Sequence, residues 1–247
     1  MIVVLRRRTI TRIMGGGLVL SALCMGLLFR PTGDRPTLAG VQETERSPIV
    51  ILDAGHGGED GGAVSSGGVA ESGINLQIAR RLQAVLDFTG QQTRMTRENE
   101  NAVYSPGAET LREKKVSDLK NRVAMVNDAE HAFLISIHQN SLPESRLVHG
   151  AQVFYNTQAG AAETALSVQQ ALNRSVNPGN EKFAREIDKT IYLMKEIDKP
   201  GILVECGFLS NEGDARLLQM PVHQTRLGAA IAAGYLEQMT KEQGRSP

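Results

Sequence analysis

The stretch IVILDAGHGGEDGGA, residues 49–63, carries the clearest structural pattern in this sequence. It begins with four apolar residues, which predict a short buried β-strand, and runs into a glycine-rich loop that continues to Gly68. A helix is predicted next, because apolar residues recur at helical spacing until Gly90. These residues are Ile74, Ile78, Leu82 and Val85. A strand, a loop and a helix in this order indicate the first unit of an α/β fold.

The rest of the chain body repeats this alternation. Apolar runs predict further strands at residues 93–96, 132–137, 151–155, 191–194 and 202–205. Helical spacing predicts a helix capped by Ser117, with Leu119, Val123 and Val126 on one face, and two more over residues 161–172 and 227–235. Residues 97–116 are polar and are predicted to be irregular. The pattern predicts an α/β, three-layer fold with a mostly parallel, mixed sheet flanked by helices, in a single domain over residues 49–242.

Composition excludes several classes of protein. The chain has 247 residues, of which 41% are apolar and 22% charged, which is ordinary for a globular domain and excludes wholesale disorder. Five of the 27 basic residues and no acid lie in residues 1–30, so residues 31–247 carry 22 basic and 27 acidic groups, a net charge of −5. A mildly acidic body argues against nucleic acid as a partner.

The first thirty residues predict a targeting segment. Arg6, Arg7, Arg8 and Arg12 precede seventeen uncharged residues, 13–29. At about 1.5 Å per residue these seventeen reach roughly 25 Å, the short end of a membrane span. Since no small-residue cleavage pattern follows closely, we expect an uncleaved N-terminal signal anchor over residues 1–30, with cleavage as the alternative. A proline-containing linker, residues 31–48, then leads to a body on the extracytoplasmic side of the cell membrane.

Chemically reactive side chains follow three of the predicted strands. His56, His138 and Glu205 each end or follow a strand, and Glu71 lies at the predicted start of the first helix. Because ligands in open α/β sheets bind beyond the carboxyl ends of the strands, we expect these four residues to converge. Two histidines and a glutamate with an open fourth position form a usual ligand set for catalytic zinc, and a further carboxylate is needed to move the proton of the attacking water.

Spacing alone leaves structural alternatives open for each of these residues. Either histidine could be hydrogen-bonded within its loop, and Glu71 could interact with the dipole or cap of its helix. Glu205 ends an apolar run, where an unpaired buried carboxylate would be costly, so a functional role is the better interpretation. The remaining polar residues near these motifs are interpreted structurally. Asp53 and Asp60 are interpreted as loop-forming carboxylates, and Asp53 is also a candidate to hold a histidine. Asn140 is interpreted as a turn residue or an orienting group for His138, and residues 112–115 as a solvated charged face.

Four motifs together resemble one enzyme family. The stretch DAGHGGEDGGA (residues 53–63), Glu71, SIHQN (136–140) and VECGFLSN (204–211) resemble, in order, the motifs of zinc-dependent N-acetylmuramoyl-L-alanine amidases of the Amidase_3 type. The resemblance implies that His56, Glu71 and His138 bind Zn²⁺ and that Glu205 is the catalytic acid and base. It also implies hydrolysis of the amide between N-acetylmuramic acid and L-alanine in peptidoglycan.

A finer resemblance is to the germination-specific members of this family in spore-forming bacteria. It rests on REKK (112–115) with Asp118, Arg122 and Asn127, on HGAQ (149–152), and on IYLM (191–194). It implies removal of stem peptides from muramic acid in the spore cortex, after which a separate deacetylase allows muramic-δ-lactam to form. A vegetative amidase for cell separation or autolysis is the alternative within the family.

Two other classes of function remain to be weighed. A non-catalytic peptidoglycan-binding protein is disfavoured because all four motif residues are present. A zinc carboxypeptidase would need a site for a free carboxylate, and no arginine is tied to a motif. We therefore expect peptidoglycan as the substrate and the membrane anchor as the means of localisation. The sequence does not identify an activating protein partner.

Overall fold

The computed structural model describes residues 47–244. The predicted signal anchor, residues 1–30, and residues 31–46 of the predicted linker lie outside the described residues. Among the helices that are described, none is long and apolar enough to cross a membrane.

Six strands form one mixed sheet in the order β2-β1-β3-β6-β4-β5. β1, β2, β3 and β6 run parallel, whereas β4 pairs with β6 in the antiparallel sense and carries β5 at the edge. The mostly parallel, mixed sheet predicted from the alternating pattern is thereby confirmed. The strands are β1 (Ile49–Ala54), β2 (Thr93–Met95), β3 (Ala132–Asn140), β4 (Gln152–Tyr155), β5 (Arg185–Glu186) and β6 (Gly201–Phe208).

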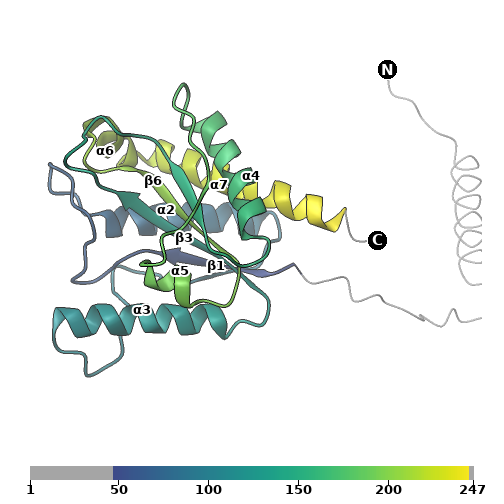
Figure 1. The fold of residues 1–247 in the computed structure, drawn as a ribbon. Coiled ribbons are helices and arrows are strands. Elements are labelled where there is room, and N and C mark those ends of the chain that lie inside the picture. Colours follow the sequence, from purple (N-terminus) through teal and green to yellow (C-terminus); the bar gives the residue numbers. More distant parts are fainter. Residues whose placement is uncertain (1–46, 245–247) are drawn as a thin grey trace, which may run out of the picture. The chain divides into compact units, whose positions relative to one another are not determined.

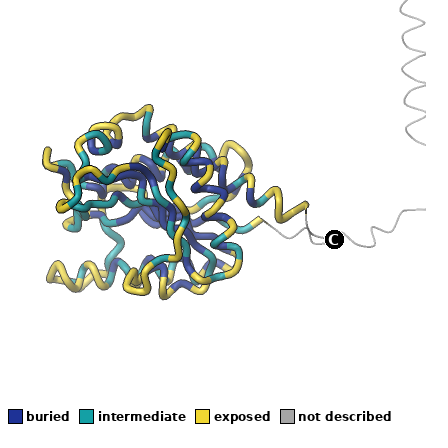
Figure 2. The backbone as a smooth tube through the Cα atoms, turned by 45° about the horizontal axis from the view of Figure 1, so that its top comes forward, coloured by how far each residue is buried: buried dark blue, intermediate teal, exposed yellow. Residues whose placement is uncertain are grey.

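Helices cover both faces of the sheet, which gives the three layers (Figure 1). α2 (Glu71–Phe88), α4 (Ala161–Ser175) and α7 (Pro221–Gln243) pack on one face, and α3 (Leu111–Asn127) and α5 (Tyr192–Glu196) on the other. α6 (Glu212–Leu218) follows β6. Successive residues of each strand point to opposite faces, so Val50 and Leu52 join the α2 side of the core and Ile51 joins the α3 side. Figure 2 shows the resulting buried centre beneath exposed outer helix faces.

Two predicted elements differ from the structure. α3 begins at Leu111 and not at Ser117, because Thr110 caps it: its side chain accepts from the backbone N–H of Glu113, whose carboxylate accepts from the N–H of Thr110. Residues 191–194 were predicted as a strand, but Ile191 is the N-cap residue and residues 192–194 belong to the one-turn helix α5. Its buried Leu193 and Met194 pack against the sheet face and do not join the sheet.

The register of the central strands places the predicted site. β3 and β6 are parallel neighbours in which His138 lies opposite Glu205. Asp53 and Ala54, at the carboxyl end of β1, lie opposite Ser136 and Ile137 of β3. The three strand ends that carry chemical groups therefore meet at one edge of the sheet, as expected for a ligand site in an α/β fold.

Candidate metal centre

His56 lies two residues beyond β1 in an unusual backbone conformation. Its φ of 60° is the only positive value among the non-glycine residues that the structure describes. The imidazole uses both nitrogens: Nδ1 lies 2.9 Å from Asp60 Oδ2, and Nε2 lies 3.2 Å from Glu71 Oε1. Asp60, and not Asp53, is thus the carboxylate that holds a histidine of this site.

Glu71 is the first residue of α2 and is buried. Its Oε2 accepts a hydrogen bond of 2.7 Å from the backbone N–H of Ala63, and its Oε1 accepts one of 3.1 Å from Asn75. The same Oε1 lies 3.2 Å from His138 Nδ1. His56, Glu71 and His138 can therefore each offer one ligand atom, and these atoms lie within 4.8 Å of one another.

Two glycines make room for this cluster. A Cβ at Gly55 would lie 2.2 Å from the His138 ring. At Gly62 it would lie 2.4 Å from Glu71 Cγ and 2.7 Å from His56 Cδ2. Real Cβ atoms do not approach other atoms so closely, so both positions require glycine if the three side chains are to keep this arrangement.

Glu205 completes the group from β6. Its Oε2 is buried and has no hydrogen-bond partner, in contrast to the satisfied oxygens of Glu71. Burial raises the pKa of Glu205 to about 7, helped by the Glu71 carboxylate and opposed by the two histidines. A buried carboxyl oxygen without a partner is unusual in a structural role, because its desolvation is uncompensated. It is suited to exchanging a proton near neutral pH.

The electrostatics of the cluster favour a cation. Burial disfavours a charged His56, but Glu71 and Asp60 outweigh it and raise the pKa of His56 to about 9. Burial likewise opposes ionisation of Glu71, yet the two histidines hold its pKa far below the usual range. The donor set consists of one carboxylate and two imidazoles, and the side chains of both histidines are partly exposed to solvent. This set fits a metal ion such as zinc.

The sequence interpretation missed that a buried arginine, Arg122, supports this loop. Arg122 is 1% exposed and pairs with Asp53 at 2.5 Å, so the role of Asp53 is to form a buried ion pair. Arg122 also pairs with Asp118 at 2.7 Å. The i, i+4 spacing of these two residues was the sequence signal that could have indicated an ion pair on this helix. Asn140 is the last residue of β3 and hydrogen-bonds to neither histidine; its Oδ1 accepts from the backbone N–H of Ser141.

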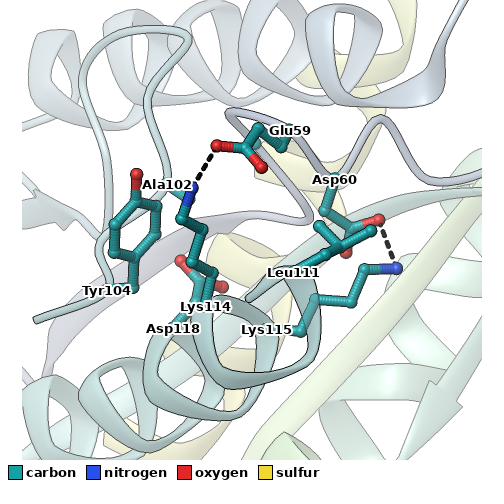
Figure 3. Close-up of a pocket in the computed structure, with 9 residues that line it drawn as sticks. Glu59, Asp60, Ala102, Tyr104, Leu111, Lys114, Lys115 and Asp118 are labelled. Carbon is teal, nitrogen blue, oxygen red and sulfur yellow. Dashed lines mark hydrogen bonds and ion pairs between the residues drawn. The ribbon is translucent and has the colours of Figure 1, made fainter. Parts of the chain in front are cut away.

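The charged run of residues 112–115 is not simply a solvated face. Lys114 pairs with Glu59, and Lys115 Nζ lies 2.8 Å from Asp60 Oδ1, which ties the start of α3 to the glycine-rich loop (Figure 3). These residues line a small pocket between the loop and α3, with Tyr104 beside Lys114.

Comparison with known proteins defines the class of this molecule. Residues 50–237, most of the chain, match the Amidase_3 family, N-acetylmuramoyl-L-alanine amidase. The chain therefore belongs to the Amidase_3 family of N-acetylmuramoyl-L-alanine amidases, and the predicted family and enzyme class are confirmed. Its activity is that of a peptidoglycan amidase.

Individual relatives refine this comparison. The germination-specific N-acetylmuramoyl-L-alanine amidase of Bacillus subtilis (strain 168) is 36% identical over 199 residues, which cover 81% of this chain and 82% of that protein. The amidase LytC of the same strain is 28% identical over 216 residues, but this chain spans only 39% of its length. The structure of the CwlD amidase from Clostridioides difficile in complex with the GerS lipoprotein covers 79% of this chain and 100% of that one, with 33% identity and a TM-score of 0.75.

Proposed function

We propose that this protein is a zinc-dependent amidase in which His56, Glu71 and His138 hold the metal and Glu205 moves the proton. The observation that carries the proposal is the convergence of three ligand atoms within 4.8 Å, together with a buried oxygen of Glu205 that has no hydrogen-bond partner. Zinc, when bound, supplies the Lewis acidity that activates a water and polarises the carbonyl of the scissile amide.

The protein groups have separate roles in this mechanism. Glu205 accepts the proton of the attacking water at its free oxygen and donates it to the leaving nitrogen of L-alanine. Its pKa of about 7, raised by burial, suits both halves of this transfer. Asp60 accepts a hydrogen bond from Nδ1 of His56 in this mechanism, so that Nε2 is the nitrogen that faces the metal.

Digestion of purified peptidoglycan tests this proposal. We expect the protein to release stem peptides that begin with L-alanine and to leave glycan strands with unsubstituted lactyl groups, as identified by mass spectrometry. A His138→Ala variant should lose both zinc and this activity, because two remaining ligands hold the metal poorly. Shortened stem peptides still attached to the glycan would indicate a carboxypeptidase and overturn the assignment, as would stoichiometric zinc in the variant.

We also propose that the amidase acts in spore cortex maturation. The support is the 36% identity to a germination-specific amidase over most of both chains. Deletion of the gene should yield spores whose cortex lacks muramic-δ-lactam, because the lactam requires muramic acid freed of its stem peptide. Normal lactam content together with chains of unseparated cells would favour the vegetative alternative.

Localisation and partner are part of the same proposal. We infer that the N-terminal arginines and the apolar segment after them hold the enzyme on the extracytoplasmic face of the cell membrane, where its substrate lies. The CwlD amidase, 33% identical to this chain, forms a complex with the GerS lipoprotein, which supports a lipoprotein partner here. Affinity purification of the tagged full-length protein from sporulating cells should recover a lipoprotein; recovery of the amidase alone would contradict this.

A further inference from the structure

The backbone strain at His56 requires a cause. A left-handed conformation is costly for a residue with a side chain, and it persists only where the surroundings fix it. The neighbouring glycines, Gly57 and Gly58, also have positive φ values but lack this cost. Something outside the loop must therefore hold His56 in place.

Arg122 of α3 holds the backbone of this loop. Its Nη2 donates to the carbonyl oxygen of His56 at 2.8 Å, and its Nη1 donates to that of Ala54 at 2.9 Å. The same Nη1 pairs with Asp53 Oδ1 at 2.5 Å. The planar guanidinium, whose donors have a fixed geometry, thus links the end of β1 to the strained residue His56.

Lys115 of the same helix holds the side chain of His56 indirectly. Its Nζ lies 2.8 Å from Asp60 Oδ1 (Figure 3). The other oxygen of Asp60 lies 2.9 Å from His56 Nδ1. A carboxylate that accepts from the outer nitrogen of a ligating histidine fixes the ring orientation and the tautomer. Lys115 in turn fixes the carboxylate.

The two basic residues belong to one stripe of α3. Lys115, Asp118 and Arg122 are spaced by three and four residues, so they lie on the same side of the helix. Asp118 accepts from Arg122 Nε at 2.7 Å and from its Nη2 at 3.2 Å, which orients the guanidinium. Three residues of α3 are buried, and two of them are this charged pair; they lie beside the apolar residues Leu119, Val123 and Val126, which pack against the sheet.

We propose that α3 is the positioning element for His56, with Arg122 fixing its backbone and Lys115 fixing its ring through Asp60. The proposal rests on the proposed role of His56 as a metal ligand. Its consequence is that changes at Lys115 and Arg122, which supply no ligand, weaken metal binding, whereas changes elsewhere on α3 do not.

Cobalt titration of the metal-free, full-length protein tests this, because Co²⁺ in a zinc site gives visible absorption bands that report affinity and geometry. Lys115→Met is expected to weaken Co²⁺ binding about 10-fold, in the range found for outer partners of metal ligands. Lys114→Met is the matched control: it removes the neighbouring ammonium, which pairs with Glu59 and not with the carboxylate that holds His56, and it should bind Co²⁺ as the wild type does.

Arg122→Lys keeps the charge but loses the fork that reaches two carbonyls, and we expect a 10- to 100-fold weaker affinity with shifted absorption bands. Val126→Ala, a buried apolar change one turn further along α3, controls for lost stability. It should lower the thermal midpoint and leave Co²⁺ affinity unchanged.

The proposal is overturned if Lys115→Met and Lys114→Met bind Co²⁺ with equal affinity. It is also overturned if Arg122→Lys loses no more Co²⁺ affinity than Val126→Ala does. If Arg122→Lys does not fold, the lysine pair decides, because Lys115 is partly exposed and pairs only at the surface of the loop. The proposed function fails separately: in that case the wild type binds no Co²⁺ or His138→Ala retains it.

Discussion

At the residue scale, Gly62 shows how little space the candidate ligands leave. Its backbone, with φ of 69°, passes beside both Glu71 and His56. The Gly62→Ala substitution adds one methyl group that would lie within 2.7 Å of each side chain, so at least one ligand must move. We expect the purified variant to contain little zinc and to show little amidase activity, measured by metal analysis and muropeptide release.

Gly68→Ala separates crowding from backbone strain. Gly68 also has a positive φ, of 80°, but a Cβ there would meet nothing within 4 Å. Both variants carry the cost of a left-handed alanine, roughly 1 kcal/mol. Gly68→Ala should therefore lose similar stability and keep its zinc. Zinc at the wild-type level in Gly62→Ala would show that the cluster does not need this glycine.

Glu205 is the residue whose removal should separate metal binding from chemistry. Gln in place of Glu205 keeps the shape and a hydrogen-bonding amide but cannot accept a proton from water. General acid–base roles contribute about 10²–10⁴-fold each, so we expect Glu205→Gln to lose at least that factor in turnover while its zinc content stays near wild type. The measurement is stem-peptide release and zinc quantitation on one sample. Joint loss of zinc and activity would recast Glu205 as a fourth ligand.

The chemistry-bearing residues were easier to predict from the sequence than the residues that support them. His56, His138 and Glu205 follow apolar runs, and strand ends in an α/β fold meet at one edge. The partner of Asp53 was not predictable, because Arg122 lies 69 residues away in a helix whose position depends on tertiary packing. Asp60, four residues beyond His56 in the same loop, contacts it instead of Asp53, because the positive φ of His56 turns the loop back on itself.

At the scale of elements, α3 illustrates where hydrophobic periodicity fails. Its first turns carry REKK, residues 112–115, and its buried residues include Asp118 and Arg122, so no apolar stripe marks its start. The capping box of Thr110 and Glu113 was the signal that could have found it. α5 was mistaken for a strand because a short apolar run has no period that distinguishes the two structures.

The ion pair between β1 and α3 makes a prediction for acid stability. Burial alone would raise the pKa of Asp53, but Arg122 and a hydrogen bond from Ser136 lower it to about 2. Because the pKa in the folded state lies below the unfolded value of about 3.9, ionised Asp53 stabilises the fold above that value. This contribution, roughly 2 kcal/mol, is lost as the pH falls from about 4 toward 2.

Asp53→Asn should therefore lower the free energy of unfolding at neutral pH and flatten its decline at acid pH. Urea unfolding at several pH values between about 7 and 3 measures both effects. Asp128→Asn, which alters an exposed carboxylate at the end of the same helix, is the control and should follow the wild-type curve. A decline as steep in Asp53→Asn as in the wild type would assign the acid sensitivity to other groups.

At the scale of the whole molecule, the two faces of the sheet have different tasks. The face under α2, α4 and α7 holds most of the apolar core. The other face carries the smaller cluster under α3 and α5, and at its carboxyl edge it carries Asp53, Ser136 and His138. Stability is thus concentrated on one side of the sheet, and the ionisable groups that support the site are concentrated on the other.

The whole chain also makes a prediction about its attachment. Residues 13–29 are uncharged and follow four arginines, and no small-residue cleavage pattern follows closely. We expect the segment to be retained, so N-terminal sequencing of the membrane fraction should begin at or near Met1. A soluble mature form that begins near Gly40 would contradict retention. In that case substrate binding or a protein partner would have to localise the enzyme.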